Sequence, residues 1–144
     1  EIMEIGGREP VHREIPRGRD VCGLMVCYDS RDRTSFFRLW HVLCRHRMDR
    51  HMEISSSDVC AKGALAAVLC GTKADLPGEP AIPQAEVRRF AEANGLVPVM
   101  TSAHSGQGVV KAFQSLVGLV LEGEAARRAE AESFGESWTQ RCFA

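Results

Sequence analysis

The sequence predicts an α/β fold of three layers, in which a mostly parallel sheet is flanked by helices. One observation is that short apolar runs, typical of strands, alternate along the chain with longer segments typical of helices. Such alternation implies parallel strands joined by right-handed crossovers, with helices on both faces of the sheet. The other is size, because 144 residues with 44% hydrophobic content suffice for about one domain with one core.

Local signals mark the individual elements. Asn94-Gly95 predicts a helix end, because glycine accepts the left-handed backbone that stops a helix. The proline-rich segment 77–83 forces a loop ahead of that helix. Residues 49–63 lack periodicity, so we expect a mobile loop there, with a phosphorylation or partner-binding loop as the alternative. We expect strands at 1–5, 20–27, 65–70 and 96–100, an irregular segment at 9–18, and helices at 34–47, 84–94 and 107–122.

A turn of sequence Thr72-Lys73-Ala74-Asp75 follows the apolar run at 65–70. The carboxylate of Asp75 offers two acceptor oxygens side by side, which match the paired N1–H and N2–H donors of guanine, whereas adenine presents an acceptor at N1. By analogy with bidentate base readout, this pairing favours GTP over ATP by about 1–3 kcal/mol. The long apolar stem of Lys73 can lie against the flat base.

A second turn, Ser102-Ala103-His104, follows the apolar run at 96–100. Ligands of open α/β sheets bind outside the carboxyl ends of the strands, so two such turns can share one ligand. Backbone N–H groups near Ala103 can meet a base that Asp75 holds. The candidate base-binding residues are therefore Thr72, Lys73, Asp75, Ser102, Ala103 and His104.

With these two turns the chain resembles the Ras superfamily of small GTPases, of the Ras/Rab-like kind, whose base loops carry N/T-K-x-D and S-A-K. Residues 21–29 with Ser35-Phe36 are similar to the fourth strand and third helix of that family, and residues 85–91 and 110–113 to its last two helices. The resemblance covers residues 1 to about 122. It implies the P-loop NTPase fold, GTP or GDP with Mg²⁺ as cofactors, and effector or regulatory proteins as partners.

Residues 1–9 are similar to the D-x-x-G-Q-E segment of the family. The resemblance implies that Glu4 holds Mg²⁺ through water, that Gly7 contacts the nucleotide, and that Arg8 occupies the position of the catalytic glutamine. Arginine has only hydrogen-bond donors, so we expect impaired hydrolysis. No G-x-x-x-x-G-K-S/T phosphate loop occurs in the sequence. We therefore expect the carboxyl-terminal two-thirds of a small GTPase, inactive and marginally folded on its own.

Two parts are expected, a small-GTPase-like domain at 1–122 and a helical or flexible tail at 123–144. The tail carries Phe134, Trp138 and Phe143, a spacing that also allows a docking helix. Cys142 is third from the end, so the C-a-a-X prenylation box is incomplete. No apolar run approaches the roughly 20 residues of a membrane span.

A net charge of -1 gives no basic stripe for nucleic acid, so the expected partners are proteins and small molecules. The six cysteines include no C-x-x-C pair, and we expect them reduced in a cytoplasmic protein. The cluster of His41, Cys44, His46 and His51 favours a polar helix face over a metal site.

Three functions stay open at this point. The first is a guanine-nucleotide switch in signalling or trafficking. The second is a Rab-like pseudo-GTPase subunit, an interaction module of ciliary or intracellular transport with weak or no hydrolysis, which the residues at positions 4 and 8 favour. The third is an unrelated doubly wound domain in which T-K-x-D is a coincidence.

Overall fold

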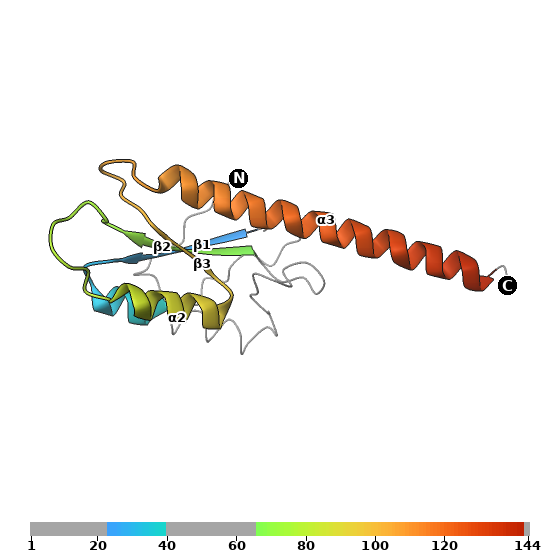
Figure 1. The fold of residues 1–144 in the computed structure, drawn as a ribbon, viewed down its shortest axis with the longest axis horizontal. Helices are drawn as coiled ribbons and strands as arrows, with labels where there is room; N and C mark the ends of the chain where they lie inside the picture. Colours follow the sequence, from blue (N-terminus) through green and yellow to red (C-terminus); the bar gives the residue numbers. More distant parts are fainter. Residues whose placement is uncertain (1–22, 40–65, 143–144) are drawn as a thin grey trace.

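The computed structural model describes residues 23–39 and 66–142, with side chains up to residue 129. Its centre is a parallel sheet of three strands in the order β1-β2-β3 (Figure 1). Gly23 lies opposite Ala66, and Val68 lies opposite Val97. Residues 33–39 are helical. The remaining elements are β1 (Gly23–Asp29), β2 (Ala66–Thr72), α2 (Gln84–Asn94), β3 (Val97–Met100) and α3 (Val109–Cys142).

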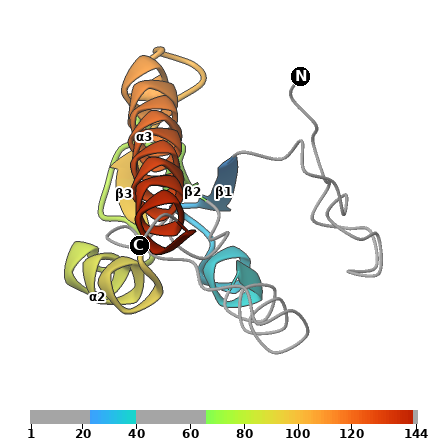
Figure 2. The same cartoon turned by 90° about the vertical axis from the view of Figure 1, so that its right-hand side faces the viewer.

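The helices lie in two layers, one on each face of the sheet (Figure 2). The helical segment at 33–39 and α2 cover one face, and α3 covers the other. Successive residues of β2 point to opposite faces, so Leu69 packs with the first layer while Val68 and Cys70 pack under α3. Residues 66–70 are all buried, because β2 has a strand on each side and a helix layer above and below.

Aromatic rings pack together in the core between the sheet and the first helix layer. The ring of Phe36 lies edge-on to Tyr28, with centroids 5.0 Å apart, and to Phe90, also at 5.0 Å. Edge-to-face pairs of this kind add about 0.5–1.5 kcal/mol beyond the area they bury. They fix the helical segment at 33–39 against α2, and with it the turn that follows β1.

The predicted fold class is confirmed, since the sheet is parallel and flanked by helices on both faces. Gly95 adopts the left-handed conformation, with φ 64 and ψ 35, and ends α2 where expected. Two strands continue further than predicted, β1 to Asp29 and β2 to Thr72. The reason is that Tyr28 and Ser30 pair with Thr72: its hydroxyl donates to the Tyr28 carbonyl at 2.9 Å, and its carbonyl accepts from the Ser30 N–H at 3.2 Å.

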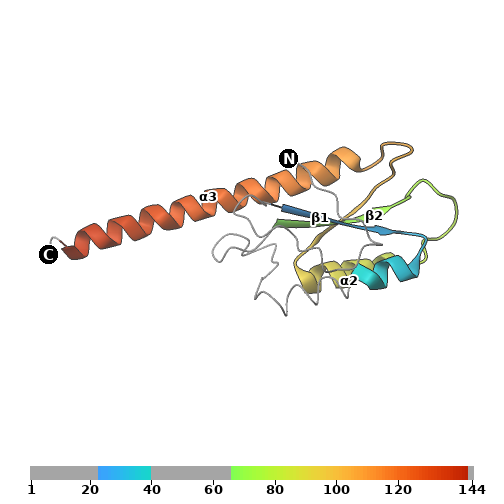
Figure 3. The same ribbon diagram turned by 180° about the vertical axis from the view of Figure 1, so that it is seen from behind.

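The helix α3 is longer than the expected 107–122, because it runs from Val109 to Cys142 and projects past the sheet (Figure 3). The proposed boundary between a domain at 1–122 and a tail at 123–144 stays a prediction, as the helix crosses it unbroken. Among the described residues, no helix is long and apolar enough to cross a membrane. The expected strand at 1–5, the segment at 9–18, the loop at 49–63, the histidine and cysteine cluster at 41–51 and the helix beyond residue 39 lie outside the described residues.

Candidate functional site

Three loops meet at one edge of the sheet, because the three parallel strands all end there (Figure 1). They are the turn after β1, the Thr72–Asp75 turn after β2, and the loop at 101–108 after β3. The N–H of Ala74 donates to the Thr101 carbonyl at 3.0 Å, and the N–H of Thr101 donates to the Gly71 carbonyl at 2.7 Å. These backbone bonds join the two turns that the sequence predicted to share one ligand.

Asp75 lies exposed at this edge, next to the second turn. A hydrogen bond from the Ser102 hydroxyl holds the pKa of the Asp75 carboxyl below its ordinary value, and its own backbone N–H and the nearby His104 act in the same direction. Asp75 is therefore ionised near neutral pH and offers only acceptor oxygens. Ala103 and His104 are exposed beside it, so the structure brings the predicted residues of the two turns together.

Ser102 is fully buried, and both its hydroxyl and its N–H have hydrogen-bond partners within the loop. Its hydroxyl accepts a hydrogen bond from the Ser105 N–H at 3.1 Å, and its own N–H donates to the Gln107 carbonyl at 2.9 Å. A hydroxyl that accepts from one group is free to donate to another, here the Asp75 carboxylate. The second loop therefore restrains the Asp75 carboxylate through Ser102.

Lys73 has a left-handed backbone, with φ 62, which is uncommon for a residue with a side chain. Its Nζ lies 2.5 Å from Oδ2 of Asp29, while Oδ1 of Asp29 accepts from the Arg31 N–H at 2.9 Å. The hydrogen bond from Lys73 lowers the pKa of Asp29, and the same bond raises the pKa of Lys73. Lys73 is thus tied to the turn after β1, an arrangement the sequence did not predict.

Arg31 is a second residue that the sequence analysis missed. Its guanidinium donates to three backbone carbonyls of the loop that follows Asp75: that of Leu76 at 2.6 Å, that of Glu79 at 2.5 Å, and that of Pro77. Such a clamp suits arginine, whose planar fork carries five donors. No sequence pattern predicts these hydrogen bonds, because Arg31 and its acceptors lie at least 45 residues apart.

Two glycines make the close approaches at this edge possible. Gly108 has φ +70, and a Cβ at this position would lie 2.0 Å from the Met100 carbonyl oxygen. Gly71 lies between Tyr28 and Met100 in the sheet, and its Cβ would lie 2.6 Å from the Met100 sulfur. At Gly71 the neighbouring side chains would have to shift, whereas at Gly108 the obstacle is backbone and φ is positive, so the return of the second loop to α3 depends on Gly108.

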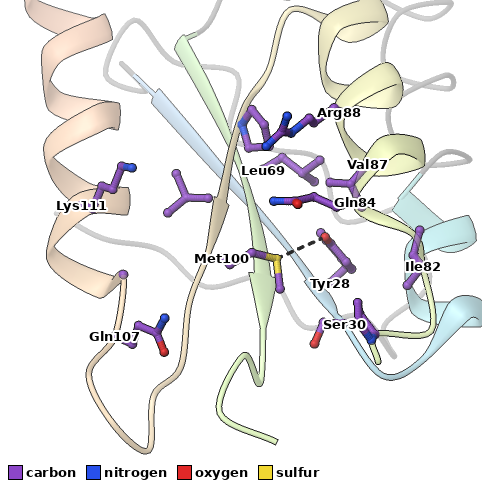
Figure 4. Close-up of a pocket in the computed structure, with 14 residues that line it drawn as sticks. Tyr28, Ser30, Leu69, Ile82, Gln84, Val87, Arg88, Met100, Gln107 and Lys111 are labelled. Carbon is purple, nitrogen blue, oxygen red and sulfur yellow. Dashed lines mark hydrogen bonds between the residues drawn. The ribbon is translucent and has the colours of Figure 1, made fainter. Parts of the chain in front are cut away.

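A cavity of about 690 Å³ lies beside the loops, between α2 and α3 and lined in part by β3 (Figure 4). Gln107 and Gly108 of the second loop line it, together with Arg88 from α2 and Lys111 from α3. None of the predicted base-binding residues lines this cavity. The candidate base site is therefore the open loop edge and is distinct from the cavity.

The predicted catalytic residue Arg8, the predicted metal residue Glu4 and the predicted nucleotide contact Gly7 lie outside the described residues. Within residues 23–39 and 66–142, no group of three or more His, Cys, Asp or Glu side chains is placed to hold a metal ion. The described residues place an exposed acceptor, Asp75, between two turns that backbone hydrogen bonds join.

The parallel sheet and the two joined turns at its edge are compared here with known protein families. The model of the Ras family matches residues 12–122, which is most of the chain, so the chain belongs to the Ras family. Ras-related protein Rab-2B of Dictyostelium discoideum is 34% identical over 127 residues, which are 85% of this chain and 55% of that protein.

Two further relatives come from Rattus norvegicus. Ras-related protein Rab-27A is 28% identical over 104 residues, 72% of this chain and 42% of its own length. Ras-related protein Rab-4A is 28% identical over 123 residues, 84% of this chain and 51% of its own length. The chain thus spans about half the length of these curated relatives.

Proposed function

We propose that the protein is a guanine-nucleotide-binding small GTPase that acts as a molecular switch in signalling or trafficking, with GTP, GDP and Mg²⁺ as its cofactors. The observation that carries the proposal is the exposed Asp75 carboxylate, which accepts a hydrogen bond from the Ser102 hydroxyl at the edge where the two turns are joined. Membership of the Ras family and the likeness to Rab proteins support it.

The arrangement favours guanine for a physical reason. The carboxylate of Asp75 has two acceptors and no donor, so it pairs with the N1–H and N2–H of guanine and leaves adenine N1 facing another acceptor. A fixed carboxylate loses little freedom when the base binds, which favours affinity. Thr72, Lys73, Ala103 and His104 would surround the base, with the Lys73 stem against its face.

The replacement Asp75→Asn tests base recognition in the full-length protein. It should weaken GDP binding by about 5-fold to 150-fold, the equivalent of 1–3 kcal/mol. Binding of xanthosine diphosphate should improve, because the asparagine amide offers one donor and one acceptor to the C2 carbonyl and N1–H of xanthine. Calorimetry with both nucleotides measures the exchange of preference.

Glu79→Gln is the matched control for that experiment. Glu79 is an exposed carboxylate in the same loop, so its replacement removes the same charge without touching the predicted base contact. We expect its GDP affinity to stay near that of the wild type. If Asp75→Asn and Glu79→Gln weaken GDP binding equally, the negative charge decides the affinity, and the pairing of the Asp75 carboxylate with the two guanine donors does not.

Hydrolysis distinguishes the switch from its alternative, a Rab-like pseudo-GTPase that serves as an interaction module. Because Arg8 has only donors and the family position holds a glutamine, Arg8→Gln should raise the single-turnover rate of GTP hydrolysis in the full-length protein. A wild type that binds GTP and turns it over as fast as Arg8→Gln would contradict the role given to Arg8. Binding without turnover in both proteins would favour the interaction module, with effector proteins as its partners.

A further inference from the structure

Asp29, the last residue of β1, lies at the loop edge although the sequence assigned it no role in base binding. Its carboxylate accepts hydrogen bonds from two directions. Oδ1 accepts from the N–H of Arg31 at 2.9 Å, and Oδ2 accepts from Nζ of Lys73 at 2.5 Å. Lys73 is one of the predicted base-binding residues, so Asp29 is joined to the candidate base site through this side chain.

The turn after β1 holds the Asp29 carboxylate by bonds that do not involve Lys73. The N–H of Asp29 donates to the Ser35 hydroxyl at 2.8 Å, and the Arg31 N–H fixes one carboxylate oxygen. Asp29 is also the register partner of Thr72, the residue that precedes Lys73 in the chain. The carboxylate therefore has a defined place opposite the start of the turn that carries Lys73.

The Lys73 side chain is restrained at both of its ends. At the backbone end, Lys73 has φ 62, and the N–H of the next residue, Ala74, donates to the Thr101 carbonyl at 3.0 Å. At the other end, the ammonium is bound to Asp29, and this hydrogen bond raises the pKa of Lys73. A lysine side chain loses more rotamer freedom on ordering than most others do. Here the bond to Asp29 orders the stem between the two ends.

An ordered stem matters for a side chain that is expected to lie against a base. A flexible side chain that becomes immobile when a ligand binds lowers the affinity, and one that is ordered beforehand does not. Attraction between two charges near the surface contributes little by itself. The effect of the ion pair on binding therefore comes from where it places the Lys73 stem.

Given the guanine-nucleotide site of the proposed function, on which this inference rests, we propose that Asp29 is a positioning residue of that site. It holds the Lys73 side chain in place for the face of the base and does not itself contact the nucleotide. The turn after β1 is then a third part of the base site, beside the two predicted turns. Asp29 affects how tightly the base binds, whereas Asp75 decides which base is preferred.

A double-mutant cycle on GDP affinity tests this role in the full-length protein. Asp29→Asn keeps the shape of the side chain and an oxygen for the Arg31 N–H, but removes the charge that binds Lys73. It should weaken GDP binding by about 2-fold to 10-fold, the effect of ordering one flexible side chain. Lys73→Met keeps an apolar stem without the ammonium and should weaken GDP binding by a similar factor. In the Lys73→Met background, Asp29→Asn should change the affinity no further, as calorimetry will measure.

Asp32→Asn is the matched control. Asp32 lies in the same turn and acts on Lys73 by charge, so its replacement removes the same charge without breaking the hydrogen bond to Lys73. Its carboxylate accepts from the Thr34 N–H at 2.8 Å, which an asparagine oxygen can also do. We expect the GDP affinity of Asp32→Asn to stay near that of the wild type.

Inosine diphosphate, which lacks the N2 amino group of guanine, separates the two aspartates. The preference for GDP over inosine diphosphate depends on the edge of the base, which Asp75 reads. Asp29 acts on the face of the base, so this preference should be the same in Asp29→Asn as in the wild type. A changed preference would overturn the role given to Asp29.

Several further results would overturn the proposal. They are an unchanged or tighter GDP affinity in Asp29→Asn, a loss that persists when Lys73 is already methionine, and an equal loss in Asp32→Asn. If Asp29→Asn does not fold, Lys73→Met decides, because an unchanged GDP affinity there would remove the basis for the role of Asp29. A wild type that binds no GDP would overturn the proposed function as well, whereas GDP binding without coupling between Asp29 and Lys73 overturns this inference alone.

Discussion

Replacing Gly108 by alanine should destabilise the protein through one identifiable contact. Gly108 follows the second loop and leads into α3, with φ +70. The new Cβ would lie 2.0 Å from the Met100 carbonyl oxygen, where real Cβ atoms keep at least 3.0 Å. The two groups must separate by at least 3.0 minus 2.0, or 1.0 Å. The obstacle is a backbone carbonyl, so no side-chain rotation relieves it.

The magnitude follows from two contributions to the free energy of unfolding. An alanine in the left-handed region costs about 1–2 kcal/mol, partly offset by about 0.4–1 kcal/mol from the less flexible unfolded chain. Forcing packed groups apart adds about 1–3 kcal/mol. Gly106 supplies the matched control, because its φ is +76 and a Cβ there meets nothing within 4 Å. Gly106→Ala should therefore show only the first contribution.

Urea unfolding of the two variants measures the difference. We expect Gly108→Ala to lower the free energy of unfolding by about 1–3 kcal/mol more than Gly106→Ala does, with similar m-values. Both variants share the backbone penalty, so their difference isolates the contact with the Met100 carbonyl. Equal destabilisation by the two alanines would refute the claim that this contact anchors the loop.

Two other perturbations test the remaining parts of the loop edge. Arg31→Ala should cost about 1 kcal/mol of stability and increase protease cleavage at 76–79, and Arg31→Lys should restore only part, because an ammonium cannot span three carbonyls. Ser102→Ala should raise the pKa of Asp75 toward its ordinary 3.8, as followed by NMR titration of the carboxyl carbon. Because folding lowers the pKa of Asp75, its carboxylate contributes stability above the pKa of the unfolded chain. That stability is lost as the pH falls through the lower pKa of the folded protein. An unchanged Asp75 titration in Ser102→Ala would remove Ser102 from the site.

The fold class could be predicted because it depends on patterns that are local in the sequence. Apolar runs of strand length, a helix stop at Asn94-Gly95 and a proline-rich loop at 77–83 each act within a few residues. The two base turns could be found for the same reason, since each directly follows a strand. Parallel pairing then places both turns at one edge, a geometric consequence that needs no knowledge of side-chain contacts.

The contacts that hold the edge could not be predicted, because they join distant residues through particular rotamers. The ion pair of Lys73 with Asp29 spans 44 residues, and the clamp of Arg31 reaches further still. Length was also misjudged for α3, which continues through Gly123 and Gly135 to Cys142. Propensity alone predicted helix there, and a glycine, although a typical helix stop, does not end this helix.

At the loop edge, residues from several strand ends restrain Asp75, the residue proposed to recognise the base. Asp75 is exposed, so an isolated carboxylate there would rotate freely and lose that freedom on binding. The buried Ser102 hydroxyl fixes the carboxylate on one side, and the Ala74–Thr101 backbone bond fixes the turn that carries it. Arg31 restrains the loop that follows, and Gly108 allows the chain to return to α3 beside Met100. These restraints come from the loops after all three strands, so the edge forms only when the parallel sheet brings the strand ends together.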